Sequence, residues 1–276
     1  MVMDYRRLNK QTVKNNYPLP LITDLVDSMG NKRVFTKMDL WWGYNNVRIK
    51  EGDKWKAAFT THVGSYEPVV MFFGMTNSPA TFQGMINERK VVAFVDDVLI
   101  GTETEEGHDK LVEEVLRRLE ENDLYVKPEK CAWKVQKVNF LEVIMGEGKI
   151  EMEEDKVAGV LNWPTPKTVR DIRKFLGLAN YYRRFVKDFA KLARPLNNLT
   201  RKEEKWKWRN EQQKAFEQLK MVFMSRPLLV APDLDKEFRV EADASNFATG
   251  GVLSIKCEDN KWRPVAYISK SLNETE

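Results

Sequence analysis

The stretch VVAFVDDVLIG, residues 91–101, decides the fold, because two apolar runs flank the adjacent carboxylates Asp96 and Asp97. Short apolar and β-branched runs joined by a polar turn predict a β-hairpin. Two like charges on an apolar hairpin are costly unless water, a cation or a hydrogen-bond donor compensates them. The doublet alone therefore leaves two interpretations open: an Asp turn exposed to solvent, or a carboxylate site that binds a cation.

A third carboxylate, Asp39, lies in an equally apolar stretch, VFTKMDLWWGY, residues 34–44. Carboxylates from two strands could share one or two Mg²⁺ ions, since this hard cation takes oxygen ligands and leaves positions for substrate phosphates. Sites with two metal ions catalyse phosphoryl transfer by stabilising both the attacking and the leaving oxygen. The three carboxylates together therefore favour phosphoryl-transfer chemistry.

Hydrophobic patterns and turn residues predict the elements around this hairpin. Further hairpins are predicted over residues 33–49, 57–73 and 138–152. Helices are predicted over 78–90 and 108–122, just before Gly30, and over most of 168–224 with a break at Pro195. After Pro227, three segments have strand-like alternation and predict an antiparallel sheet: 238–245, 250–257 and 262–272.

Composition narrows the class of protein. The 276 residues are 42% hydrophobic and 31% charged, which is typical of globular chains, and the net charge of +4 is too small to identify a polyanionic partner. Two distant cysteines and two histidines predict neither a disulfide framework nor a zinc site. No apolar run reaches membrane-spanning length. We expect a soluble intracellular protein, cytoplasmic or nuclear, and the sequence leaves its oligomeric state open.

Ten short motifs occur in one order along the whole chain: DYRRLNKQT, YPLP, KMDLWWGY, FGMTNSPATFQ, FVDD, KPEKC, NFLEVIM, WPTP, FLGLANYYRRF and EADAS. As a set they resemble the reverse transcriptases of gypsy-type long-terminal-repeat retrotransposons. The resemblance implies an α+β fold, a right-hand polymerase with fingers, palm and thumb followed by the first strands of a ribonuclease H-like domain. It also implies RNA and DNA template-primers, deoxynucleoside triphosphates, two Mg²⁺ ions at the polymerase site and a location that includes retrotransposon particles.

The same resemblance divides the chain into three parts. Residues 1–163 match the fingers and palm, residues 164–226 a helical thumb or connection, and residues 227–276 a ribonuclease H-like domain. Basic residues interleave with apolar ones through the thumb region, for example Arg183 and Arg194, and would suit contacts with phosphates. An ordinary solvated helix face is the alternative.

Site residues follow from the motifs that match. The catalytic, metal-binding carboxylates are Asp39, Asp96 and Asp97, and Asp243 matches the first catalytic carboxylate of ribonuclease H. The implied nucleotide-binding residues are Leu40, Gly43, Tyr44, Phe73 and Gly74. The implied template- and primer-binding residues are Asp4, Arg6, Asn9, Pro79 and Gln83. Tyr44 matches the aromatic gate that excludes ribonucleotides, although a core aromatic is its alternative interpretation, and a solvated charge run is the alternative for residues 4–12.

The sequence also departs from the family. Glu142 replaces a usual Gly near the primer end, Phe72 a usual Pro and Phe94 a usual Tyr, and the region before Val91 is shorter by about two to three helical turns. We expect the charge of Glu142 to repel primer phosphates and, if the usual Gly adopts a positive φ, the loss of backbone freedom to alter the hairpin. The family's basic fingers residues lie before Met1 and its other ribonuclease H carboxylates after Glu276, so we expect weakened nucleotide binding and an incomplete ribonuclease H site.

These departures keep an alternative open, a decayed retrotransposon-derived protein that binds nucleic acid without catalysis. An RNA-copying RNA polymerase is a third possibility, since polymerase palms share the carboxylates. The aromatic gate implied at Tyr44 argues against it.

Overall fold

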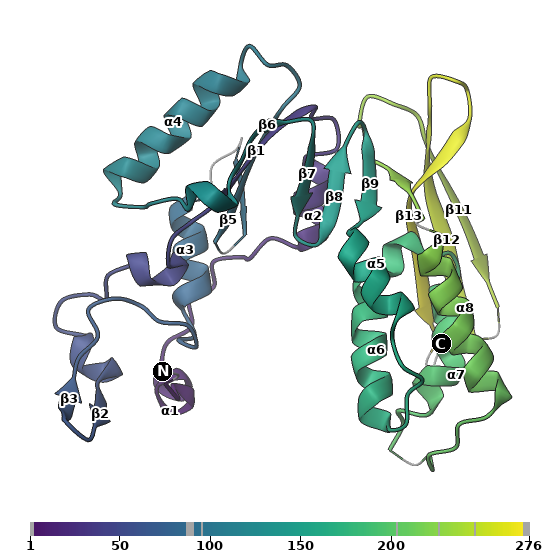
Figure 1. Ribbon diagram of the computed structural model, residues 1–276, viewed down its shortest axis with the longest axis horizontal. Helices are drawn as coiled ribbons and strands as arrows, with labels where there is room; N and C mark the ends of the chain where they lie inside the picture. The colour runs from purple at the N-terminus through teal and green to yellow at the C-terminus, as the bar shows by residue number, and fades with distance from the viewer. Residues whose placement is uncertain are drawn as a thin grey trace. The chain divides into compact units, whose positions relative to one another are not determined.

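The computed structural model describes residues 3–86, 91–94, 96–202, 204–225, 227–245 and 247–272. The chain forms two compact units, residues 1–140 and 141–276, coloured from purple to teal and from teal to yellow in Figure 1. The three-part division expected from the family stays a prediction.

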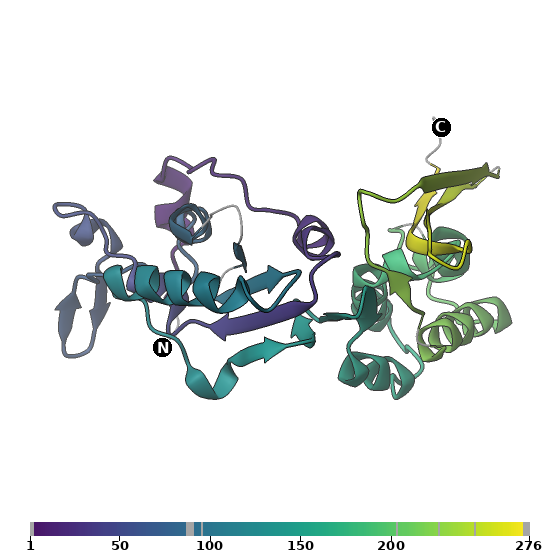
Figure 2. The same ribbon diagram turned by 90° about the horizontal axis from the view of Figure 1, so that it is seen from above.

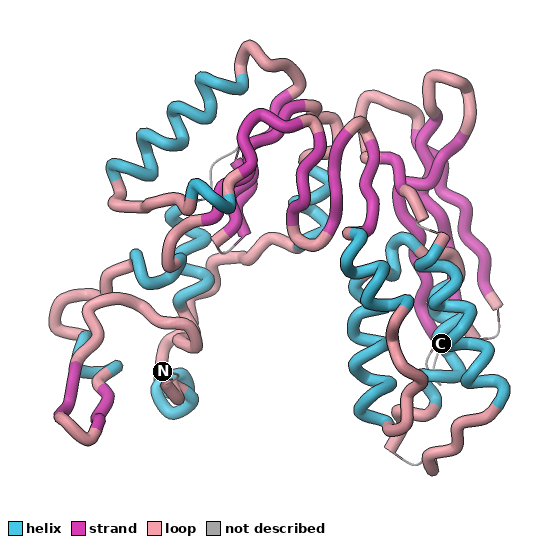
Figure 3. Tube along the Cα trace, viewed as in Figure 1, coloured by secondary structure: helices cyan, strands magenta, loops and turns pink. Residues whose placement is uncertain are grey.

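A four-stranded antiparallel sheet organises unit 1 (Figures 1 and 3). Its strands lie in the order β4 (Val91–Phe94), β5 (Asp97–Thr102), β1 (Val34–Asp39) and β6 (Ala132–Val135). Strands β4 and β5 pair from Val91 with Ile100 to Phe94 with Asp97, so the predicted hairpin is confirmed. Val95 lies outside the described residues.

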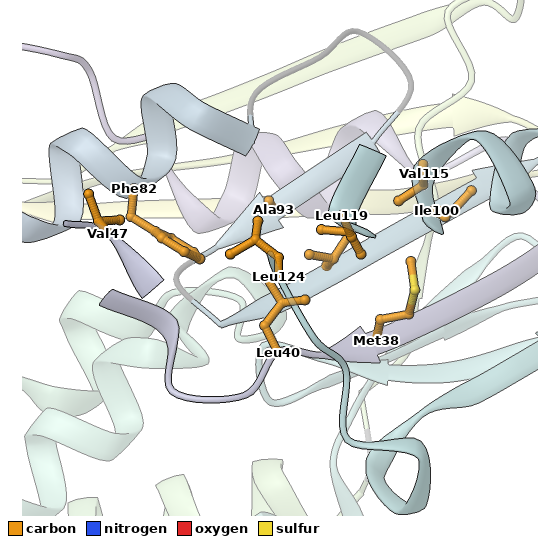
Figure 4. Packing of buried hydrophobic residues seen from close by; sticks show 10 residues of the cluster. Met38, Leu40, Val47, Phe82, Ala93, Ile100, Val115, Leu119 and Leu124 are labelled. Atoms are coloured by element: carbon orange, nitrogen blue, oxygen red, sulfur yellow. The ribbon is translucent and has the colours of Figure 1, made fainter. Parts of the chain in front are cut away.

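One face of this sheet packs against helices α3 (Ser78–Ile86) and α4 (His108–Glu121). Met38, Ile100 and Phe82 lie in this cluster with Val115 and Leu119 of α4, as Figure 4 shows. Because side chains alternate along a strand, the neighbours of Met38 in β1 point to the opposite face of the sheet. Lys37 and Asp39, the two neighbours of Met38, therefore point away from the helices.

The predicted hairpin over residues 33–49 is wrong. Strand β1 pairs with β5 and β6, and after Asp39 the chain turns through Trp42 (φ +59°) and Gly43 (φ +39°) into the 3₁₀ helix η1 (Gly43–Asn46). Consecutive residues in the left-handed region cannot continue an extended strand. The partners of β1 come from distant segments, and no local pattern encodes them.

Smaller elements complete unit 1. They are α1 (Arg6–Gln11), α2 (Ile22–Ser28), η2 (Lys54–Ala57), β2 (Phe59–Thr61), β3 (Gly64–Tyr66), η3 (Pro128–Lys130) and β7 (Lys137–Phe140). The short β2–β3 hairpin confirms the turn predicted near Gly64. The helix predicted over 78–90 is confirmed to Ile86, and residues 87–90 lie outside the described part.

Unit 2 begins with the hairpin of β8 (Val143–Gly146) and β9 (Lys149–Met152), with β10 (Leu229–Val230) paired to β9. Its helical elements are α5 (Glu154–Leu161), α6 (Val169–Tyr181), η4 (Arg183–Phe185), α7 (Phe189–Asn198) and α8 (Asn210–Met224). The last four confirm the helical region predicted over 168–224, whereas α5 lies outside it. Phe175 and Phe216 join α6 to α8, with ring centres 4.7 Å apart.

Pro195 does not break the helical region, and this prediction is wrong. It lies inside α7, which continues to Asn198. A proline in a helix leaves the carbonyl four residues earlier without its usual N–H partner. Ala193 and Leu196 are fully buried on either side of Pro195, and packing of this face offsets the loss.

The three strands predicted after Pro227 form an antiparallel sheet in the order β11 (Phe238–Ala244), β12 (Ala248–Lys256) and β13 (Trp262–Ser271), visible in Figure 2. Nearly all side chains of β11 are exposed, whereas Ile255 and Val265 are buried. No helix in the described part of the chain is long and apolar enough to cross a membrane.

Candidate functional site

Three carboxylates lie at one end of the unit 1 sheet. Asp39 ends β1 and pairs directly with Asp97, the first residue of β5. Asp96 lies in the turn before Asp97, where its carbonyl accepts a hydrogen bond of 2.9 Å from the backbone N–H of Leu40. The fold therefore brings the three predicted catalytic residues to adjacent positions, from segments more than fifty residues apart.

The Asp96 carboxylate is enclosed. Its Oδ1 atom is buried and has no hydrogen-bond partner among the described residues. A Cβ atom added to Gly43 would lie 1.7 Å from this oxygen, so only glycine leaves room for the carboxylate as it stands. Burial raises the pKa of Asp96, the charges of Asp39 and Asp97 raise it further, and Lys127 opposes them.

Lysine side chains accompany the other two carboxylates. Lys127 donates from Nζ to Oδ1 of Asp39, and Lys37 Nζ lies 3.2 Å from Oδ1 of Asp97. The hydrogen bond to Asp39 raises the pKa of Lys127. Lys130 is more distant, with Nζ 3.9 Å from Oδ2 of Asp39. The positive charges offset the repulsion between carboxylates that lie side by side.

The donor types suit a hard divalent cation, since carboxylate oxygens are its preferred protein ligands and Asp96 Oδ1 is unpartnered. Within the described residues, however, no group of three or more Asp, Glu, His or Cys side chains is arranged to hold a metal ion. Asp39 and Asp97 point at lysines in this structure. The three carboxylates are therefore of the chemical type that binds a divalent cation, but in this structure Asp39 and Asp97 are oriented by their contacts with lysines.

Asn9 fixes the loop that carries two of the predicted nucleotide-binding residues, Phe73 and Gly74. Its Nδ2 donates to the Gly74 carbonyl over 2.7 Å, and its Oδ1 accepts from the backbone N–H of Thr76 over 2.8 Å. Gly74 has a φ of +96°, a conformation that favours glycine, and the Phe73 side chain is 58% exposed. Both amide atoms of Asn9 are therefore engaged in holding this loop.

The other predicted template-contacting residues lie in two settings. Asp4 and Arg6 form an exposed ion pair of 2.6 Å, and this arginine lowers the pKa of Asp4 to about 2. Pro79 lies in the first turn of α3. Gln83 is buried and donates from Nε2 to the Ala93 carbonyl over 2.8 Å, which ties α3 to strand β4 and speaks against a template contact by this side chain.

Leu40 is fully buried in the core, which speaks against a nucleotide contact by its side chain. Tyr44 lies in η1, and its predicted gate role falls on a side chain outside the described ones. In unit 2, Asp243 lies exposed in β11 and accepts a hydrogen bond of 2.9 Å from the backbone N–H of Ala244. The roles predicted for these residues stay predictions.

A strained turn in unit 2 carries the substitution noted at position 142. Leu141 and Glu142 have φ values of +48° and +62°. The hydroxyls of Tyr181 and Tyr182 donate to their carbonyls over 2.5 Å and 2.9 Å, and Lys156 pairs with the Glu142 carboxylate at 2.7 Å. The backbone at position 142 does have a positive φ, and the charge expected to repel primer phosphates has a lysine partner.

Two of the basic residues in the thumb region are engaged inside unit 2. Arg183 donates to the Ser269 carbonyl, and the Arg194 guanidinium lies 3.8 Å from the centre of the Phe247 ring. These contacts join the helices to the three-stranded sheet. They give both arginines a packing role in addition to any contact with phosphates.

Sequence reasoning missed the lysines at the carboxylate site. Lys37 could have been found, because alternation places it two residues before Asp39 on the same face of β1. Lys127 could not, since 88 positions separate it from its partner Asp39. The KPEKC motif indicated only that this segment belongs to the family.

Comparisons with known proteins agree with the geometry. The family model described as reverse transcriptase (RNA-dependent DNA polymerase) matches residues 1–145, and the RNase H-like domain found in reverse transcriptase matches residues 208–276. The chain is 38% identical over 283 aligned residues to the Transposon Tf2-3 polyprotein of Schizosaccharomyces pombe, with all of this chain and 21% of that protein covered. The Transposon Tf2-7 polyprotein is 37% identical with the same coverage. The chain thus spans about a fifth of the length of these curated relatives.

Solved structures show the same fold. The foamy viral protease-reverse transcriptase in complex with RNA/DNA hybrid matches with a TM-score of 0.87 and 25% identity, over 100% of this chain and 38% of that one. A second structure, described as the foamy viral protease-reverse transcriptase dRH in complex with ds DNA, matches with a TM-score of 0.88 and 25% identity, over 100% of this chain and 50% of that one. With a polymerase family model covering more than half of its residues, the chain belongs to the reverse transcriptase family.

Proposed function

We propose that this chain contributes the catalytic carboxylates of an RNA-directed DNA polymerase, which extends a primer by nucleotidyl transfer from deoxynucleoside triphosphates. The observation that carries the proposal is the pairing of Asp39 with Asp97 beside the enclosed Asp96. Family membership supports it, and so do similar solved structures that are complexes with RNA/DNA hybrid and with ds DNA.

In the proposed reaction, the primer 3′-hydroxyl attacks the α-phosphorus of the incoming nucleotide, and pyrophosphate leaves. Asp39, Asp96 and Asp97 would hold two Mg²⁺ ions, which when bound lower the pKa of the hydroxyl and offset charge on the phosphate oxygens. Gly43 leaves room for Asp96, and Asn9 fixes the loop that presents Phe73 and Gly74 to the nucleotide. The contribution of this chain is therefore to orient the metal ligands and the substrates.

Primer extension on an RNA template with Mg²⁺ and deoxynucleotides tests the proposal. The double variant Asp96→Asn, Asp97→Asn removes two carboxylates, and we expect it to lower the extension rate by roughly 10³-fold or more, since metal-assisted stabilisation contributes several kcal/mol. A matched control, Asp109→Asn with Asp235→Asn, removes two exposed carboxylates outside the site and should extend primers like the unchanged chain.

Binding of a labelled RNA/DNA hybrid is measured in parallel. If the Asp96→Asn, Asp97→Asn variant extended primers as well as the unchanged chain does, the assignment of these carboxylates as catalytic would be overturned. A chain that binds the hybrid and extends no primer would instead be a nucleic-acid-binding protein without catalysis.

A further inference from the structure

The carboxylate site of unit 1 contains as many lysines as carboxylates. Each cationic Nζ atom lies within 4 Å of a carboxylate oxygen: Lys127 and Lys130 next to Asp39, and Lys37 next to Asp97. The site is therefore electrically balanced by the chain itself. A divalent cation that binds here must compete with charges that already offset its ligands.

Lys127 is built into this site more firmly than Lys130. Its backbone N–H donates to the Asp39 carbonyl over 2.8 Å, and its own carbonyl accepts from the Cys131 thiol over 3.1 Å. The Lys127 side chain is 19% exposed and that of Asp39 is 21% exposed, whereas Lys130 is 60% exposed. Partial burial weakens solvent screening, so the contact between Lys127 and Asp39 is the stronger one.

The aromatic neighbour of Lys127 gives its ammonium a second place to lie. Nζ is 5.8 Å from the centre of the Trp41 ring, within the range at which a cation is attracted to an aromatic face. The backbone of Trp41 is held in place, because its N–H donates to the Tyr125 carbonyl over 2.7 Å. The ammonium can therefore leave Asp39 and remain charged beside this ring.

We propose that Lys127 is a positioning residue for Asp39, an internal counter-ion that holds the carboxylate in the metal-free site and yields it to a divalent cation. The proposal rests on the proposed function, because it assigns the metal site to these carboxylates. It explains why Asp39 points at a lysine in a site whose donor atoms suit a metal ion. Its consequence is that Lys127 lowers the intrinsic metal affinity of the site.

This consequence is tested by titrating the whole chain with Mn²⁺ in the absence of nucleotide. Electron paramagnetic resonance measures the concentration of free Mn²⁺ and so gives the affinity. We expect Lys127→Gln to bind Mn²⁺ about fivefold more tightly, since a partly exposed contact of this kind is worth on the order of 1 kcal/mol. Lys127→Arg keeps the charge and should bind like the unchanged chain. Lys130→Gln is the matched control and should change the affinity less than about twofold.

A measurement on the unchanged chain covers the case in which Lys127→Gln does not fold. Acetylation of lysines by acetic anhydride, read by mass spectrometry, should modify Lys127 severalfold faster at saturating Mg²⁺ than without metal, because its ammonium is then released from Asp39. Labelling of Lys130 should change little. Labelling of Lys127 that is unchanged or slower with Mg²⁺ would overturn the proposal.

The outcomes separate this proposal from the proposed function. If the Asp96→Asn, Asp97→Asn variant loses Mn²⁺ binding while Lys127→Gln binds no more tightly than the unchanged chain, the metal site stands and the counter-ion role fails. If Mn²⁺ binding survives in the double carboxylate variant, the metal does not bind at these residues and both proposals fail.

Discussion

Two aspartates predicted to be catalytic, Asp96 in unit 1 and Asp243 in unit 2, lie in opposite surroundings. Asp96 has a buried carboxylate oxygen pressed against Gly43, with lysines on the neighbouring carboxylates. Asp243 lies on a strand whose side chains are nearly all exposed. A sequence motif thus predicts which residues are candidates for catalysis, whereas the burial of the carboxylate determines how much activity we expect a substitution to remove.

Among substitutions that leave the carboxylates themselves in place, the largest effect is expected from Gly43→Ala. The added Cβ would lie 1.7 Å from Asp96 Oδ1 at a φ of +39°, so the carboxylate must move. Displacement of a reacting group by about 1 Å costs on the order of 10²-fold in rate, and we expect primer extension to fall at least that far. Primer-extension rates at saturating nucleotide measure this.

Gly177→Ala is the control for that substitution. Gly177 lies exposed inside α6, with no atom within 4 Å of an added Cβ. Alanine should leave extension unchanged and raise the free energy of unfolding by up to about 1 kcal/mol. Equal activity of Gly43→Ala and the unchanged chain would show that Asp96 does not need its present position.

Local patterns predicted the site's hairpin but not its enclosure. Residues 91–101 carry their own turn and both of their strands, so periodicity was sufficient. Strand β1 pairs with residues more than fifty positions later, and Lys127 reaches Asp39 from 88 positions away, so neither could be read from neighbouring residues. Pro195 misled because packing of α7 outweighed a strong local signal.

A second prediction concerns the pH dependence of stability, because His108 is fully buried against strands β1 and β5. Its Nε2 and Nδ1 atoms lie 2.8 Å from the hydroxyls of Thr36 and Thr102. The Thr102 hydroxyl donates to the Thr104 carbonyl, so it accepts from Nδ1, and in the neutral ring Nε2 accepts from the Thr36 hydroxyl. The network satisfies both nitrogens of a neutral ring, and burial lowers the pKa of His108.

The unfolded chain then binds this proton more readily than the folded one. The free energy of unfolding should fall as the pH drops below 6.5, the ordinary pKa of histidine, and the contribution should be complete above it. Urea unfolding between pH 5.5 and 7.5 measures the slope. His108→Asn should reduce the slope and the exposed His62→Gln should retain it; a slope that disappears only in His62→Gln contradicts the prediction.

A smaller effect is expected at the strained turn of unit 2. Glutamate at a φ of +62° is unfavourable by about 1 kcal/mol relative to glycine, whereas the partly exposed pair with Lys156 contributes only about 0–1 kcal/mol. Tyr181 and Tyr182 hold the turn through its carbonyls, which glycine retains. Glu142→Gly should therefore raise the free energy of unfolding by up to about 1 kcal/mol.

Lys156→Gln is the control at this turn, because it removes the ion pair and keeps the strained backbone. It should lower the free energy of unfolding slightly, opposite in sign to Glu142→Gly. Urea unfolding of both variants measures the difference. Destabilisation by Glu142→Gly beyond that of Lys156→Gln would mean that the carboxylate contributes more than the backbone strain costs.

The smallest effect is expected from Asp243→Asn, the counterpart of a substitution at Asp96. The exposed carboxylate of Asp243 accepts one local hydrogen bond from the Ala244 N–H, and an asparagine oxygen can accept it as well. Primer extension should stay within about twofold, and the free energy of unfolding within about 0.5 kcal/mol, as is usual for exposed positions. A loss of extension close to that of Asp96→Asn would break the comparison, because an exposed carboxylate would then matter to polymerisation as much as an enclosed one.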